Sequence, residues 1–174
     1  AIIGAFLLLG GNGAVVWAEM RVRSGMTALI VATVPLWMVL ADWLRPGGVR
    51  PTGRVALGLL VGFAGLIYLV GPGETGADAV DGLGAAVLLL GSLLWAIGSI
   101  YARGAPRPKA PLLGTGMEML AGGALLVVVG IAVGEAALVD LSTVSTRSIV
   151  ALAYLIVFGS LIGYSAYVWL LHVT

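Results

Sequence analysis

Glu118 is the residue of this sequence whose type and position most clearly suggest chemistry. It lies about two helical turns inside a long apolar run, Leu112 to Val133. A charged side chain at the centre of a membrane helix costs roughly 2.5 to 3.5 kcal/mol, so another interaction must offset that cost. Its neighbours at helical spacing, Gly114, Ala121 and Gly122, are small, which predicts a carboxylate that points into a helix bundle. Two roles stay open: a hydrogen bond that only fixes helix packing, or a place on a substrate or proton path.

Polar side chains recur at helical spacing in four other apolar runs. Asn12 and Glu19 share one face of the first run, and Thr33 and Trp37 share one face of the second. Each group could line a wet cavity that binds a polar solute, or could make only an interhelical hydrogen bond or a solvated helix end. Two later runs carry the remaining candidates, which are Trp95 and Ser99, beside Ser92, on one stripe and Ser160, Tyr164 and Tyr167 on another.

Signatures of catalysis are missing from the sequence. It contains no His-Glu-x-x-His, no Gly-x-Ser-x-Gly, no P-loop and no Gly-x-Gly-x-x-Gly after a strand. Cysteine is absent and His172 is the sole histidine, so neither a thiolate site nor a histidine cluster for a metal can be built. The sequence therefore predicts a protein that is not an enzyme and that holds no metal or cofactor.

The composition indicates which solvent surrounds these residues. Of the 174 residues, 60% are hydrophobic and 10% are charged, and the mean hydropathy is +1.12. Such a chain has too little polar surface to coat a soluble domain, so the lipid bilayer is the expected partner. The net charge is only +1 and the basic residues are scattered, which argues against nucleic acid as a partner.

Long apolar runs fill most of the sequence. A membrane helix needs about 20 mainly apolar residues, because the hydrocarbon core is roughly 30 Å thick and each helical residue rises about 1.5 Å. The sequence predicts an all-α integral membrane protein with six transmembrane helices. Because apolar runs reach both ends of the sequence, we interpret it as an interior fragment. The six runs are Ala1–Ala18, Gly25–Leu44, Val55–Val70, Leu83–Ala102, Leu112–Val133 and Ser148–Leu171.

A Gly- and Pro-rich stretch, Gly71 to Gly84, separates the first three runs from the last three. It is acidic and contains no Lys or Arg. Since loops alternate between the two sides of a membrane, the positive-inside rule places this stretch outside and the loops around Gly48 and Pro108 in the cytoplasm. The basic residues counted are Arg45, Arg50, Arg54, Arg103, Arg107 and Lys109 on the cytoplasmic side, and Arg21, Arg23 and Arg147 on the other.

Small residues and one proline predict how the helices pack. Membrane helices approach most closely where glycines repeat on one face, so such repeats predict tight helix contacts. Pro35 removes the amide donor for the Val31 carbonyl, which predicts a kink in the second run. The glycine repeats are Gly58, Gly62 and Gly65, then Gly130 and Gly134, then Gly159 and Gly163.

The order of several short motifs resembles EamA-type permeases of the drug/metabolite transporter superfamily. The resemblance spans nearly the whole sequence. The matching pieces are Gly11-Asn12-Gly13 with Trp17-Ala18-Glu19, Ala32-Thr33-Val34-Pro35-Leu36-Trp37, the run Gly58 to Gly65, Ser92-Leu93-Leu94-Trp95-Ala96-Ile97-Gly98-Ser99, Glu118-Met119-Leu120-Ala121-Gly122, and the run Phe158 to Tyr167.

The resemblance implies a ten-helix carrier built from two inverted five-helix repeats, of which the six runs would be helices three to eight. Residues 1–71 would be the C-terminal part of the first repeat, 72–82 an outward-facing linker, and 83–174 the N-terminal part of the second. The implied function is transport of a small organic metabolite, amino acid or drug by alternating access, with protons as a candidate coupling ion. The expected location is the bacterial plasma (inner) membrane, and the fragment alone would be inactive.

Two other functions stay open at this point. A membrane-embedded enzyme acting on lipid-linked substrates would need a cluster of acid, base or metal-binding groups at one membrane face. A structural membrane subunit would bury its polar stripes against partners and leave no cavity. The sequence does not predict the substrate, the direction of transport or the oligomeric state.

Overall fold

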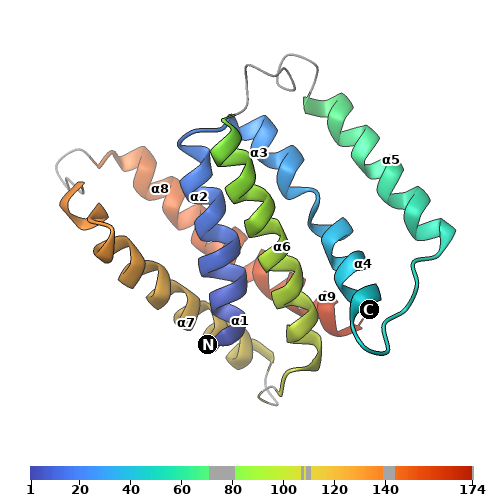
Figure 1. Ribbon diagram of the computed structural model, residues 1–174. Helices are drawn as coiled ribbons and strands as arrows, with labels where there is room; N and C mark the ends of the chain where they lie inside the picture. The colour runs from blue at the N-terminus through green and yellow to red at the C-terminus, as the bar shows by residue number, and fades with distance from the viewer. Residues whose placement is uncertain (71–80, 107, 109–110, 139–143, 174) are drawn as a thin grey trace.

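The computed structural model of this protein describes residues 1–70, 81–106, 108, 111–138 and 144–173. Within these ranges every regular element is a helix, and the long helices run up and down as one bundle (Figure 1). The predicted all-α fold is confirmed. Most of the acidic stretch between the two halves, residues 71–80, and the basic residues Arg107 and Lys109 lie outside the described ranges.

The helix bounds follow the apolar runs. Five helical segments of the described part of the chain are long and apolar enough to cross a membrane. The remaining expected run, Val55–Val70, coincides with the helix α5, Gly53–Val70. The elements are α1 (Ile2–Gly4), η1 (Ala5–Asn12), α2 (Gly13–Glu19), α3 (Ser24–Val31), α4 (Val34–Leu44), α5 (Gly53–Val70), α6 (Gly82–Gly104), α7 (Pro111–Ala132), η3 (Glu135–Leu138), α8 (Thr146–Tyr154), η5 (Leu155–Tyr164) and α9 (Ser165–Val173).

Two of the spans contain a wider, π-helical segment, which the apolar pattern does not predict. In the first span η1 lies between α1 and α2, and in the last η5 lies between α8 and α9. A π-helix pairs each amide with a carbonyl five residues earlier, as the Gly13 amide does with the Leu8 carbonyl. Such segments are rare and recur at functional sites.

The second span breaks where Pro35 predicts a kink. Helix α3 ends at Val31 and α4 begins at Val34, with Pro35 in its first turn. At the break, the Ile30 carbonyl accepts hydrogen bonds from the Thr33 hydroxyl at 2.6 Å and from the Thr33 amide at 3.0 Å. The Ile30 carbonyl is thus satisfied locally, as a lipid-embedded helix requires.

Helix α6 is the central element. It packs against η1 and α2 on one side and against α3 and α4 on the other, while α7 covers the far side of η1. Asp81 begins α6 by accepting a hydrogen bond from the Gly84 amide at 3.1 Å, as a helix N-cap does. Helix α5 lies at the edge of the bundle against α3 (Figure 1).

Close helix contacts form at glycines other than the predicted repeats. A Cβ atom on Gly122 of α7 would lie 2.5 Å from Leu8 Cβ and 2.8 Å from the Gly4 carbonyl oxygen. Gly91 of α6 meets the Ala14 side chain equally closely, at 2.5 Å. The prediction from the repeats is wrong: among the described residues, nothing from another helix lies within 4 Å of such an added atom at Gly58, Gly62, Gly65, Gly134, Gly159 or Gly163, and Gly130 meets only the side chain of Glu135, in the short η3 that follows its own helix.

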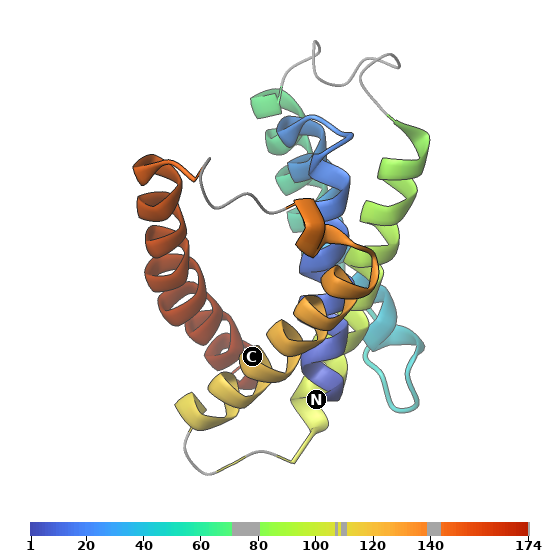
Figure 2. The same cartoon turned by 90° about the vertical axis from the view of Figure 1, so that its left-hand side faces the viewer.

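The last span is attached to the bundle at one end only. Helices α8 and η5 lean away from the other spans, whereas α9 returns to contact α6 and α7 (Figure 2). Residues 144–159 are all exposed, and burial begins at Tyr164 and Val168. These exposed apolar side chains suit a lipid environment better than water.

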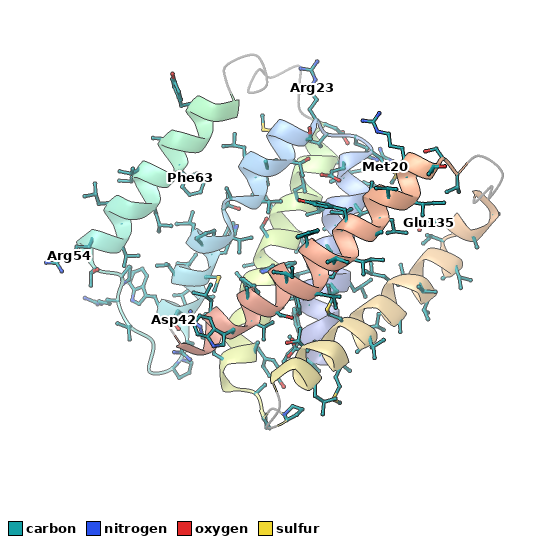
Figure 3. The ribbon with its side chains drawn as sticks, turned by 180° about the vertical axis from the view of Figure 1, so that it is seen from behind. Met20, Arg23, Asp42, Arg54, Phe63 and Glu135 are labelled. Atoms are coloured by element: carbon teal, nitrogen blue, oxygen red, sulfur yellow. The ribbon has the colours of Figure 1, made fainter. Side chains whose placement is uncertain are left out.

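The two ends of the bundle carry the connections in alternation. Met20, Arg23 and Glu135 lie at one end and Asp42 and Arg54 at the other (Figure 3). The assignment of loops to the two sides of the membrane by their basic residues assumes this alternation. Which end faces the cytoplasm stays a prediction.

Candidate functional site

Two cavities lie on either side of the first span, and both are lined by polar residues. We name the first the α3 cavity. It lies between α2, α3 and α6 and has a volume of about 390 Å³. Its polar lining consists of Asn12, Glu19, Ser24, Thr27 and Ser92, and its apolar lining includes Val15, Val31 and Trp95.

The second cavity, which we name the η5 cavity, lies between η1, α6, α7 and the last span. Its volume is about 480 Å³. Both volumes fall in the range of about 300 to 1,000 Å³ that is typical of small-molecule sites. Its polar lining consists of Asn12, Trp95, Ser160, Tyr164 and Tyr167.

Trp95 and Asn12 line both cavities and so form the wall between them. Gly11 lets the indole of Trp95 lie directly against the first span, since a Cβ at this position would collide with the ring atom Cε3. Any larger residue at position 11 would push the indole away. The sequence predicts each of the two wall residues as a candidate for the substrate pathway but gives no sign that they divide two spaces.

A closed hydrogen-bond ring fixes the position of this indole. Trp95 Nε1 donates to the Tyr167 hydroxyl at 2.9 Å, and the Ser99 hydroxyl donates to the Trp95 carbonyl at 2.7 Å. The Ser99 and Tyr167 oxygens are 2.5 Å apart. Because Ser99 donates its single hydroxyl hydrogen to the Trp95 carbonyl, the Tyr167 hydroxyl must be the donor in its hydrogen bond with Ser99. Every donor in the ring is used, so the ring ties α9 to α6.

Glu118 is buried behind Tyr164 and is not part of either cavity lining. Only 6% of its surface is exposed, which confirms that the carboxylate points into the bundle. The Tyr164 hydroxyl donates to Glu118 Oε2 at 3.3 Å, a long contact between α7 and the end of η5. Tyr164 itself lines the η5 cavity, so it separates the carboxylate from that space.

Thr33 and Trp37 stand apart from the other predicted site residues. Trp37 Nε1 donates to the Thr33 hydroxyl at 3.1 Å, and that hydroxyl in turn donates to the Ile30 carbonyl. These bonds lie within the second span and stabilise its break. Neither residue lines the α3 cavity or the η5 cavity.

Thr27 and Ser92 are cavity residues that the sequence does not single out. Ser92 shares the polar stripe of Trp95 and Ser99, which is a usable signal. Thr27 lies near the start of the second run, three residues after Ser24, which lines the same cavity; this spacing is the signal in the sequence that could have marked it. Both side chains are almost fully buried.

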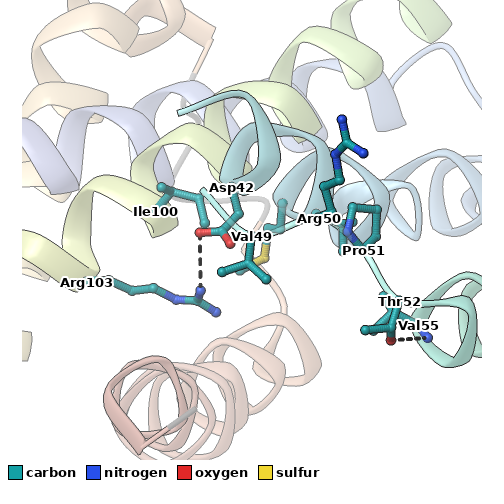
Figure 4. A pocket seen from close by; sticks show the side chains of 10 residues that line it. Asp42, Val49, Arg50, Pro51, Thr52, Val55, Ile100 and Arg103 are labelled. Atoms are coloured by element: carbon teal, nitrogen blue, oxygen red, sulfur yellow. Dashed lines mark hydrogen bonds and ion pairs between the residues drawn. The ribbon is translucent and has the colours of Figure 1, made fainter. Parts of the chain in front are cut away.

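A third cavity, of about 240 Å³, lies at the end of the bundle that carries Asp42, and none of the predicted site residues lines it. Asp42 contacts Arg103 there at 3.9 Å (Figure 4), and this ion pair joins α4 to the end of α6. A second ion pair, with Arg45 at 2.8 Å, lies within the end of α4. Arg50, Pro51 and Thr52 line its opposite wall (Figure 4).

No metal site can be assigned within the described ranges. No group of three or more His, Asp or Glu side chains is close enough there to hold an ion. The chemistry that the two central cavities can perform is hydrogen bonding and aromatic packing against an organic molecule.

Comparison with known proteins identifies similar membrane proteins. The chain is 37% identical over 173 residues to a protein of Escherichia coli K12 named "Uncharacterized inner membrane transporter YedA". The aligned region is 99% of this chain and 54% of that protein. It is also 32% identical over 157 residues to a chloroplastic WAT1-related protein of Arabidopsis thaliana, and this aligned region is 84% of this chain and 36% of that protein. No protein-family model and no solved structure matches it.

The similarity to YedA extends over nearly the whole of the chain, which spans about half the length of that relative. Five apolar helices of membrane length accompany it. The chain is an integral membrane protein, and it is similar in sequence to a named inner-membrane transporter.

Proposed function

We propose that the protein containing this chain is a carrier of the drug/metabolite transporter superfamily, of the EamA type, and not an enzyme. It moves a small organic molecule across the bacterial inner membrane. The observation that carries this proposal is the pair of cavities sharing Asn12 and Trp95, in a chain similar to a named transporter. A structural subunit would have no need of such cavities.

The substrate binds in the α3 and η5 cavities, beside the wall of Asn12 and Trp95. Inverted-repeat carriers bind near the bilayer midplane, where the repeats meet, and open to each side in turn. The last span supplies the moving surface. It is attached by the packing of Tyr164 and Val168 against Leu7 and by hydrogen bonds of Tyr164 and Tyr167, which can break and reform at low cost.

Glu118 couples this movement to protons in our proposal. A buried carboxylate inside a membrane protein is a functional group by default, and the Tyr164 hydroxyl links it to the η5 cavity. Protonation would turn Glu118 from a hydrogen-bond acceptor into a possible donor, which changes its contact with Tyr164. The state of the carboxyl group thereby controls one attachment point of the last span.

The test of the carrier proposal is solute flux by the full-length protein in sealed vesicles. A panel of radiolabelled amino acids, amines and sugars identifies a transported solute. Substituting Trp95→Ala or Asn12→Ala then lowers its flux at least tenfold, whereas the lipid-exposed control Leu57→Ala leaves it unchanged. Flux that is unaltered in both cavity variants would show that the cavities are not the substrate site.

Proton coupling is tested in the same vesicles by imposing a pH gradient. Glu118→Gln keeps the shape of the side chain and an acceptor for Tyr164, but it cannot exchange a proton. We expect the variant to retain exchange of solute across the membrane and to lose the stimulation by the gradient. A variant that still responds fully to the gradient rules out Glu118 as the coupling group.

A further inference from the structure

Two buried hydroxyl groups beside the α3 cavity have no hydrogen-bond partner among the described residues. They belong to Thr27 on α3 and Ser92 on α6, whose exposed fractions are 3% and 4%. Their oxygens are shielded from solvent. A third shielded oxygen, Asp42 Oδ1, differs from them because it contacts Arg45 Nε at 2.8 Å.

Unpaired hydroxyls are unusual in a membrane helix. A Ser or Thr side chain there commonly donates to the carbonyl four residues earlier, as Ser99 does to Trp95 on the same helix α6. Leaving a buried polar group unpaired destabilises the protein, so a native structure needs a reason to retain one. Thr27 and Ser92 come from different helices and line the same cavity, which points to one shared reason.

We propose that Thr27 and Ser92 form a polar subsite of the α3 cavity that hydrogen-bonds a bound solute. This inference rests on the proposed carrier function. Rotation about χ1 moves each oxygen between three staggered positions, so a ligand in the cavity can draw both hydroxyls toward it. The hydroxyls gain their partners only when the cavity is filled.

The rest of the cavity lining indicates the chemical class of that solute. Glu19 adds a carboxylate, the Asn12 amide can both accept and donate, and no Lys or Arg is among the lining residues. A lining with a carboxylate and no cation favours a ligand group that donates hydrogen bonds, a hydroxyl or an ammonium, and disfavours a carboxylate. Val15, Val31 and the face of Trp95 favour an apolar body attached to it. The subsite therefore takes a small molecule with a donor head and an apolar body.

Thermal unfolding of the full-length protein tests whether the hydroxyls are unpaired. Thr27→Val preserves the shape of the side chain, and Ser92→Ala removes only the hydroxyl. We expect each to raise Tm by roughly 2 to 4 °C, because an unsatisfied polar group is removed. The matched control Ser99→Ala removes a paired hydroxyl from the same helix and lowers Tm. Equal losses of Tm in all three variants would overturn the proposal.

Binding of three matched probes to the same variants tests the subsite and its chemistry. Phenethylamine, phenethyl alcohol and hydrocinnamate share a phenyl body and differ in carrying an ammonium, a hydroxyl or a carboxylate. We expect the wild-type protein to bind the amine or the alcohol, and the Thr27→Val, Ser92→Ala double variant to lose that binding at least fivefold. Which probe responds identifies the donor group.

Binding of hydrocinnamate alone, of none of the probes, or of all three unchanged in the double variant would overturn the subsite. These results are separate from those for the carrier proposal. A protein that transports a solute equally well without the two hydroxyls lacks the subsite but is a carrier. A protein that binds through them and moves no solute has the subsite but is not a carrier.

Discussion

The first and the last spans have the same internal order but opposite surroundings. Each consists of a short α-helix, a π-helical segment and a second α-helix, and the π segments end at Asn12 and Tyr164, which both line the η5 cavity. Buried residues occur along the whole first span, from Gly4 to Ala18, whereas the described residues of the last span are buried only at Tyr164 and Val168. The same local design is thus used once inside the bundle and once at its edge.

The two spans also differ in how they are held. The first is held by backbone contact, because Gly4 meets Gly122 of α7 and Gly11 meets the ring of Trp95. The last is held at one end, through the hydroxyls of Tyr164 and Tyr167 and through the packing of Tyr164 and Val168 against Leu7. Closely packed backbones tolerate little displacement, whereas side chains can change rotamers and hydrogen-bond partners. The comparison predicts a fixed first span and a last span that can move.

The largest effect is expected where the first span meets α7. In Gly122→Ala the new methyl would lie 2.5 Å from Leu8 Cβ and 2.8 Å from the Gly4 carbonyl oxygen, so the backbones must separate. Overpacking of this kind costs about 1 to 3 kcal/mol, which thermal unfolding in detergent would detect as a lower Tm. Gly123→Ala is the matched control, since no described atom lies within 4 Å of its added methyl. Equal Tm values for the two variants would contradict the idea of a fixed first span.

A smaller effect is expected where the last span is attached. Tyr167→Phe removes the hydroxyl that accepts from Trp95 and bonds to Ser99, while the ring contact with Trp95 remains. Hydrogen bonds between membrane helices average about 0.6 kcal/mol, so losing two should cost about 1 kcal/mol. Spin labels on α6 and α9 should report a broader distance distribution. Tyr154→Phe, at an exposed position of α8, should change neither Tm nor the distances.

The smallest effect is expected in the exposed part of the last span. At Gly159 no described atom lies within 4 Å of an added methyl, so Gly159→Ala meets no obstacle. Because Ala favours a helix more than Gly, Tm should stay the same or rise slightly. A large fall in Tm would mean that this face packs closely against another helix and would remove the contrast with Gly122.

The sequence predicts the helices well and their contacts poorly. Apolar runs mark the spans within a few residues, because lipid requires about 20 apolar residues to cross. Glycine repeats fail as contact markers, since a glycine allows close approach but cannot specify the partner. Gly58 and Gly62 repeat at four residues without close contacts, while Gly122 is in tight contact without a predicted repeat.

Part of the candidate site could be predicted because helical spacing places side chains on one face. Ser160, Tyr164 and Tyr167 share one face of the last run in this way, and all three line the η5 cavity. Thr33 and Trp37 share a face as well, yet their hydrogen bonds close within their own span. The sequence alone cannot distinguish a side chain bonded within its helix from one facing a cavity.

The π-helical segments and the unpaired hydroxyls of Thr27 and Ser92 were beyond prediction for the same reason. Apolar residues suit an α-helix and a π-helix equally, so the hydrophobic pattern does not separate them. A hydroxyl is paired or unpaired according to its rotamer and to the helix opposite. Both features depend on packing between spans that are distant in the sequence.

The indole of Trp95 has a consequence for stoichiometry. As long as it stands between the α3 and η5 cavities, each space is closed to a molecule that extends into the other. Under the carrier proposal, the two spaces would hold two small molecules in separate compartments. A single chamber for one elongated molecule would require the indole to leave this position.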